Sequence, residues 1–145
     1  MQTFIEPDTK TDALAHSIIG AAIEVHRLLG LGFLESVYEE AVCVELSDRG
    51  IDFERQKEIG VAYKGRLVGQ QRIDLLVGQL LIVELKTVEE LAEVHKAQLI
   101  SYLKATGLML GLLINFNVPV LKSGIQRVVY TNNHSAAWRS SRLGG

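Results

Sequence analysis

The sequence predicts an α/β protein with a mixed β-sheet flanked by helices. Near the N-terminus, apolar residues recur at helical spacing, whereas short apolar runs bounded by glycine follow from residue 52 onwards. A helical segment at 88–105 lies between two of these runs, as a crossover does between parallel strands. The chain has 145 residues, of which 48% are hydrophobic and 22% charged, so we expect one globular domain over residues 1–145.

Two helices are expected first. Residues 11–29 carry an apolar stripe, and Gly30-Leu31-Gly32 ends that segment. The second helix should run over 33–49 and end at Gly50. Its predicted apolar stripe consists of Leu34, Val37, Ala41 and Val44, with Tyr38 beside it.

Strand character follows over 52–59 and 61–63, then over 66–77 and 80–86, which makes three or four strands with reversals at Lys64-Gly65 and Gly78-Gln79. Thr87, with Glu90 three residues later, is typical of a helix start, which predicts a helix over 88–105. Two more strands are expected at 108–116 and 125–130. The core therefore spans about residues 11–131, and 132–145 should form a loose tail.

Composition excludes several classes of protein. The single cysteine, Cys43, allows no intrachain disulfide, and no Cys/His cluster suggests a zinc site. The N-terminus lacks the pattern of a signal peptide, and the longest apolar runs are far shorter than the roughly 20 residues that span a bilayer. We therefore expect a cytoplasmic protein without a membrane partner.

Two carboxylates violate the apolar pattern of their strands. Glu84 lies within the run Leu80–Lys86, and Asp74 lies within Ile73–Val77. A buried ionised carboxylate costs several kcal/mol unless it is paired, hydrogen-bonded or bound to metal. An ion pair between Glu84 and Lys86, which share a strand face, would explain the presence of Glu84 in an apolar strand. Alternatively, the two carboxylates bind a divalent metal ion, and Lys86 orients a water molecule beside it.

The metal site sets a condition on the hairpin between these strands. A two-residue turn at Gly78-Gln79 would pair Asp74 with Val83 and place the two carboxylates on opposite faces. A three-residue loop, a bulge or a distorted strand is needed to bring them together.

Two other patterns have both a structural and a functional interpretation. Glu35 lies in the first turn of the second helix, where the helix dipole stabilises a carboxylate. His95, Gln98 and Tyr102 share one stripe of the third helix, which fits either a polar flank or a substrate-facing surface.

Together, these residues resemble a known family. The segment Gly32-x-x-Glu35-x-x-Tyr38 resembles the signature of the GxxExxY family, and Asp74 with Glu84-Leu85-Lys86 is similar to the core of the PD-(D/E)xK nuclease superfamily. In addition, Gln98-x-x-x-Tyr102 resembles the QxxxY motif of RecB-type nucleases. Ile73 stands where many members have proline. The resemblance implies a restriction-endonuclease-like core with the order αβββαβ.

The resemblance also implies a reaction and its residues. Asp74, Glu84 and the main-chain carbonyl of Leu85 would bind Mg²⁺ or Mn²⁺, with Glu35 reaching the metal directly or through water. Lys86 would orient the attacking water. A set of four residues would position the substrate or brace the site: Gln98, Tyr102, Tyr38 and His95. We therefore predict a metal-dependent nuclease, with DNA as the expected substrate and RNA as the alternative.

A second function fits the same residues. The chain could be a catalytically silent nucleic-acid-binding or protein-assembly module that keeps the nuclease fold. The formal net charge of −2 excludes neither function, because all 17 Asp and Glu residues precede residue 94. Basic residues alone follow, which makes the C-terminal third a candidate phosphate-contacting surface: Lys96, Lys104, Lys122, Arg127, Arg139 and Arg142. A small domain offers little surface to a duplex, so we expect a homodimer.

Overall fold

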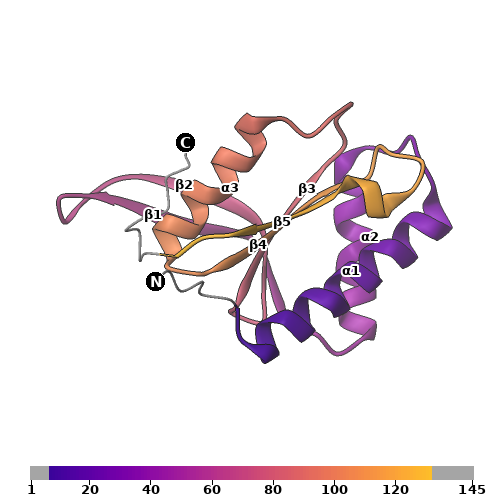
Figure 1. The fold of residues 1–145 in the computed structure, drawn as a ribbon, viewed down its shortest axis with the longest axis horizontal. Coiled ribbons are helices and arrows are strands. Elements are labelled where there is room, and N and C mark those ends of the chain that lie inside the picture. Colours follow the sequence, from indigo (N-terminus) through magenta and orange to yellow (C-terminus); the bar gives the residue numbers. More distant parts are fainter. Residues whose placement is uncertain (1–6, 132–145) are drawn as a thin grey trace, which may run out of the picture.

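The computed structural model describes residues 7–131, which form a five-stranded sheet with helices on both faces (Figure 1). Two helices, α1 (Thr9–Leu29) and α2 (Glu35–Asp48), pack on one face, and α3 (Glu93–Thr106) packs on the other. Asp8 caps α1 by accepting a hydrogen bond of 2.7 Å from the Thr11 backbone N–H. The α/β class with a mixed, helix-flanked sheet is confirmed.

The strands lie in sequence order across the sheet. They are β1 (Phe53–Tyr63), β2 (Arg66–Val77), β3 (Leu81–Lys86), β4 (Leu110–Asn115) and β5 (Ile125–Val129), and the short 3₁₀ helix η1 (Leu121–Gly124) precedes β5. Strands β3 and β4 are parallel and joined through α3, and the other pairs are antiparallel. The tail expected at 132–145 lies outside the described residues.

Alternating strand residues build two cores. Leu75, Val83 and Leu112 face α1 and α2, whereas Ile82 and Leu113 face α3. Burial of each such side chain contributes about 1.5–3 kcal/mol. At Gly111 a Cβ atom would lie 2.8 Å from a Leu99 methyl group, so glycine allows α3 to approach the sheet closely. The two cores hold β3 and β4 between them.

Two local expectations were wrong. Helix α3 begins at Glu93, not 88, because the His95 ring caps it: Ala92 N–H donates to His95 Nδ1 at 2.9 Å. Thr87 lies in the connection before it. Helix α2 buries Tyr38, Val42 and Leu46 in place of the predicted stripe.

The exposed fractions on α2 show the size of that second error. Leu34 is 75% exposed and Val44 is 55% exposed, although both belong to the predicted stripe. The helix is rotated because Tyr38 stacks on Phe116, with ring centroids 4.6 Å apart, and because Glu39 finds partners on β1. None of the helices within residues 7–131 is long and apolar enough to cross a membrane.

Candidate active site

The candidate site lies where β2 and β3 separate. Gly78, Gln79 and Leu80 form a three-residue connection, and Val77 pairs with Leu81. The pairing stops at Leu75 and Val83, so Asp74 and Glu84 occupy the next row opposite each other, on one face of the sheet. Beyond this row, β3 stays paired with β4 and β2 follows β1 away (Figure 1). The geometric condition that the sequence set for a shared site is therefore met.

Asp74 and Glu84, which we call the carboxylate pair, replace the missing backbone pairing with their side chains. The Asp74 backbone N–H donates to Glu84 Oε2 at 2.7 Å, and the Leu85 N–H donates to Asp74 Oδ2 at 2.9 Å. Each carboxylate thus satisfies a backbone donor that the separating strands leave without a ladder partner. This reciprocal arrangement fixes both side chains in one orientation.

The electrostatics of the carboxylate pair are unfavourable. Glu84 is only 4% exposed, and burial, with the neighbouring Asp74 charge, raises its pKa to about 8. Burial also raises the pKa of Asp74, and burial followed by the charge of Asp74 raises that of Glu35. Asp74 and Glu84 therefore repel each other, Glu35 adds negative charge nearby, and a cation would relieve that repulsion.

Lys86 lies at the end of β3, two residues after Glu84. Its positive charge favours ionisation of Glu35, Asp74 and Glu84, yet it forms no ion pair with any described carboxylate. The strand end is held rigidly, because Phe116 N–H donates to Lys86 O at 2.9 Å. The structure therefore does not contain the Glu84–Lys86 ion pair of the alternative interpretation.

Buried Asn115 fixes the chain that leaves β3. Its side chain donates to Val88 O at 2.8 Å and accepts from Val88 N–H at 3.0 Å. Asn115 is 1% exposed and pairs with Lys86 across the β3–β4 ladder. Sequence reasoning missed this residue, although a polar residue that ends an apolar run, directly before Phe116, is a recognisable signal.

A second acidic group borders the site but is neutralised. This group, the ion-pair cluster, consists of Glu39 and Glu40 on α2 with Arg55 and Gln56 on β1. Arg55 lies 3.2 Å from Glu39 and 3.1 Å from Glu40, and Gln56 Nε2 donates to Glu39 Oε1 at 3.0 Å. Sequence reasoning missed Glu39, which follows Glu35 by one helical turn and is buried beside it.

Gln56 connects the two groups. Its Nε2 also lies 3.4 Å from Asp74 Oδ1, a long hydrogen bond. Its backbone has a φ of 50°, in the left-handed region, and the β1–β2 ladder skips Gln56 and Asp74. The sheet is thus distorted on both sides of Asp74, and Gln56 links its carboxylate to Glu39.

Helix α3 brings the predicted Gln98–Tyr102 pair towards the carboxylates. Tyr102 is buried, and after burial the charges of Glu84 and Asp74 raise its pKa, whereas the Gln98 side chain lowers it. Gln98 is exposed. His95 uses its Nδ1 atom to cap α3 one turn earlier. Tyr102 therefore lies beside the carboxylates and Gln98 lies beside Tyr102.

Tyr38 lies elsewhere. It is 1% exposed, its hydroxyl donates to Gly30 O, and Phe33 N–H donates to that hydroxyl at 3.3 Å. Direct positioning of substrate by Tyr38 does not fit this burial. Its contacts instead hold the loop that places Glu35 at the start of α2.

The available donors are the hard oxygen atoms that Mg²⁺ and Mn²⁺ prefer. Glu84 is buried, and its Oε1 atom accepts no hydrogen bond from any described residue. Within residues 7–131, no three His, Cys, Asp or Glu side chains converge as a metal-binding group. Two carboxylates and a main-chain carbonyl nevertheless suit Mg²⁺, which usually keeps several waters. The residues present therefore fit a divalent ion held by few protein ligands.

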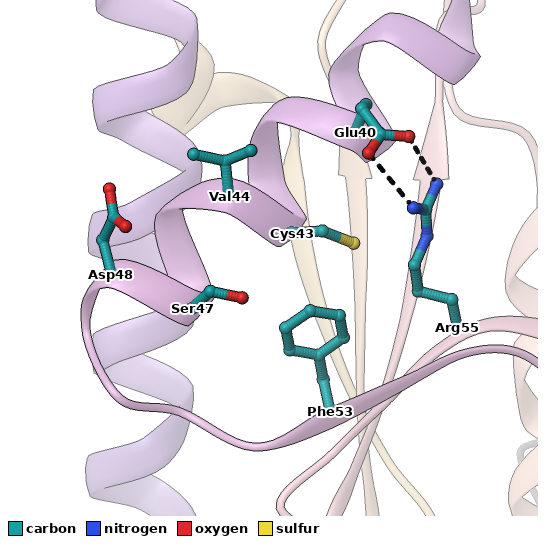
Figure 2. A pocket seen from close by; sticks show the side chains of 7 residues that line it. All are labelled: Glu40, Cys43, Val44, Ser47, Asp48, Phe53 and Arg55. Atoms are coloured by element: carbon teal, nitrogen blue, oxygen red, sulfur yellow. Dashed lines mark hydrogen bonds and ion pairs between the residues drawn. The ribbon is translucent and has the colours of Figure 1, made fainter.

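A shallow pocket between α2 and the start of β1 does not share this chemistry. Figure 2 shows Arg55 reaching Glu40 at one end, with Cys43 and Phe53 beside them. Burial raises the pKa of the Cys43 thiol to about 11, so it is protonated at neutral pH and a poor nucleophile. The pocket is thus bounded by the ion-pair cluster.

The basic residues of the C-terminal third do not form one surface. Lys96 and Lys104 lie on α3, Lys122 lies on η1, and Arg127 on β5 pairs with Asp12 at 2.6 Å. Arg139 and Arg142 lie outside the described residues. The part of this proposal that the structure can address is therefore not supported.

Comparisons with known proteins agree with this fold. The crystal structure of SSO0001 is similar, with a TM-score of 0.50 and 14% sequence identity. The match covers 89% of this chain and 71% of that one, and it is a similarity of fold alone. Curated proteins give no significant sequence match. A family model described as the PD-(D/E)XK nuclease superfamily matches residues 12–128, a span that contains both carboxylates and Lys86. The chain belongs to the PD-(D/E)XK nuclease superfamily.

Proposed function

We propose that this protein hydrolyses phosphodiester bonds in DNA with the help of Mg²⁺ or Mn²⁺. The observation that carries the proposal is the carboxylate pair itself. Glu84 accepts from the Asp74 backbone N–H, and Asp74 accepts from the Leu85 N–H. Glu84 is buried, Asp74 is half-buried, and the lysine beside them forms no ion pair with either. Such an arrangement is costly for stability alone. It suits a site that receives a cation and a phosphate.

Each residue has a distinct task in this proposal. Asp74, Glu84 and the Leu85 carbonyl would hold the metal ion, and Glu35 would contact it through water. When bound, the ion would supply charge neutralisation at the phosphate and a lowered pKa for water. Lys86 would orient the attacking water and stabilise negative charge on the phosphate oxygens.

The neighbouring residues would keep this geometry. Gln56 would restrain Asp74, and Asn115 would hold the strand end that carries Lys86. Tyr102 would brace the carboxylates from α3, while exposed Gln98 and half-buried His95 would face the nucleic-acid backbone. Restraint of this kind keeps catalytic groups in place without reorganisation during the reaction.

Cleavage assays with a matched pair of variants test the proposal. Linear, circular and branched DNA, and RNA, are incubated with wild type, Lys86→Ala and the surface control Lys122→Ala. We expect Mg²⁺- or Mn²⁺-dependent cleavage of DNA by wild type and Lys122→Ala, and at least about a hundredfold loss in Lys86→Ala. Metal binding without cleavage of any substrate would contradict a nuclease and favour the silent binding module.

Two finer statements belong to the same proposal. We propose that the chain is a GxxExxY-type member of the superfamily, because Gly32, Glu35 and Tyr38 match that signature. Tyr38 would support the motif through its bond to Gly30 O. We also propose a homodimer, because one small domain provides little surface to a duplex. Light scattering at several protein concentrations, with and without DNA, tests the dimer, and a monomer throughout would contradict it.

A further inference from the structure

The β1–β2 hairpin extends beyond the sheet as a two-stranded arm (Figure 1). We call residues 59–71 the ribbon arm. It is paired from Ile59 and Gln71 to Tyr63 and Arg66, and Lys64 and Gly65 turn it with positive φ values of 51° and 76°. Strand β2 pairs with β3 only at residues 75–77, so within the described chain the ribbon arm has no neighbouring strand.

The ribbon arm gains little from packing. Every residue from 62 to 72 is exposed, including Tyr63, Leu67 and Val68 at 63%, 66% and 60%. A two-stranded hairpin on its own is marginally stable in water. Val68 is an extra residue in the pairing, and such a bulge increases twist and redirects side chains. These features indicate a surface that contacts a partner.

Charge identifies the kind of partner. The ribbon arm contains no Asp or Glu, and Lys64 and Arg66 flank its tip. Neither forms an ion pair with a described residue, whereas Arg72 and Lys57 at its base are paired with Glu58 and Glu54 at 3.3 and 3.2 Å. Cations without an ion-pair partner among the described residues, at the tip of a hairpin in the otherwise acidic N-terminal part of the chain, favour the binding of a polyanion. Two such tips meeting in a symmetric dimer would repel each other.

The reach of the ribbon arm matches a duplex. Asp74 lies nine residues from Gly65, and a strand rises about 3.3 Å per residue, so the tip lies about 30 Å from the carboxylate pair. That length corresponds to about nine base pairs along DNA. A two-stranded ribbon also fits the major groove, where either Gln70 or Gln71, which point to opposite faces of the ribbon, would meet base edges.

We propose that the ribbon arm is a duplex-DNA-binding element that contacts the substrate about nine base pairs from the cleaved phosphate, through Lys64 and Arg66. This role rests on the proposed nuclease function for its position relative to the cut. Its binding is nevertheless measurable without cleavage. The arm would provide affinity and length preference, while chemistry stays at the carboxylate pair.

Binding and cleavage are compared on duplexes of 8 and 30 base pairs. Anisotropy in EDTA measures affinity for wild type, the double variant Lys64→Ala/Arg66→Ala and the control Lys104→Ala/Lys122→Ala. On the 30-mer, we expect the arm variant to bind about tenfold more weakly, with a salt slope smaller by about two. On the 8-mer, wild type and arm variant should bind alike, and the control should behave as wild type on both.

The outcomes separate the two proposals. If no DNA is cut but the arm variant still loses affinity for the 30-mer alone, the ribbon arm proposal stands and the nuclease proposal fails. Equal loss on both duplexes, or no loss, would overturn the ribbon arm proposal even in an active nuclease. A wild-type dimer that becomes a monomer in Tyr63→Ser/Leu67→Ser, with unchanged duplex affinity, would also overturn it in favour of a second copy of the chain.

Discussion

Two acidic groups lie side by side in this protein and differ in one respect. The ion-pair cluster surrounds Glu39 with Arg55 and Gln56, which provide charge and hydrogen bonds. The carboxylate pair receives two backbone N–H donors and one long side-chain bond from Gln56, and Lys86 remains outside ion-pair contact. The first group has its partners within the fold, whereas the second is arranged to take a positive charge from elsewhere. This difference separates acids that stabilise the protein from acids that we propose act on substrate.

The largest expected effect concerns cleavage. Glu84→Gln removes a proposed metal ligand and should reduce cleavage at least about a hundredfold. Glu39→Gln keeps the shape of its side chain and one acceptor oxygen, lies outside the proposed ligand set, and should cost about tenfold or less. Initial rates at saturating Mn²⁺ measure both. Equal losses would contradict the division between the two groups.

Glu84→Gln should also stabilise the protein at alkaline pH. Glu84 has a raised pKa of about 8, so the folded state holds its proton over a range where the unfolded chain has lost it, and stability falls as pH rises towards 8. In EDTA at pH 8.5, Glu84→Gln should gain about 2–3 kcal/mol of unfolding free energy, and the gain should disappear near pH 4.5. Urea unfolding measures this difference.

A surface carboxylate provides the control for that experiment. Glu58→Gln alters an exposed ion pair with Arg72, so its unfolding free energy should change by less than about 0.5 kcal/mol at either pH. Destabilisation of Glu84→Gln at pH 8.5 would show that the charged form is favoured in the fold.

Removing the cation of the ion-pair cluster should destabilise the protein, whereas Glu84→Gln should stabilise it. Arg55→Ala leaves buried Glu39 with Gln56 as its remaining side-chain partner and should lower the unfolding free energy by about 1–2 kcal/mol. Because the two side chains are in contact, Glu39→Gln should recover part of this loss. Thermal or urea unfolding measures the unfolding free energies of the single and double variants. Additive changes in the double variant would contradict the coupling between Arg55 and Glu39.

The smallest expected effect lies between the two groups. Gln56→Ala should weaken Mn²⁺ binding about tenfold, because Asp74 loses its side-chain restraint. Gln56→Gly should weaken it equally but be more stable than the alanine variant by about 1 kcal/mol, since glycine tolerates a φ of 50°. Titration calorimetry and urea unfolding measure these quantities, and unchanged Mn²⁺ affinity would remove Gln56 from the site.

The sequence predicts most of this fold because its signals are local. Apolar runs and glycine turns mark β2, β3 and β4, and the turn at Lys64-Gly65 needs only its own residues. The burial of Glu39 depends on Arg55 and Gln56 across the fold, so helical periodicity alone selected the wrong face of α2. The start of α3 was likewise missed because a histidine, not threonine, caps it.

The candidate site was predicted in part for the same reason. Asp74 and Glu84 are conspicuous in apolar strands, but whether they meet depends on one residue in the hairpin connection, Leu80. The reciprocal bonds to backbone N–H groups could not be deduced, because they arise only where the ladder ends. Gln56 escapes detection because its role depends on contacts with distant residues. Asn115 is recognisable only as a polar residue that ends an apolar run, because its bonds to Val88 form only in the fold.

Calorimetric titration with Mn²⁺ at pH 8 tests the central claim most directly. We expect one Mn²⁺ site in wild type and in Glu39→Gln, and no measurable binding in Asp74→Asn or Glu84→Gln. Each variant should unfold cooperatively, which separates loss of the site from loss of the fold. Binding that persists unchanged in both Asp74→Asn and Glu84→Gln would contradict the proposal that the carboxylate pair holds the metal ion.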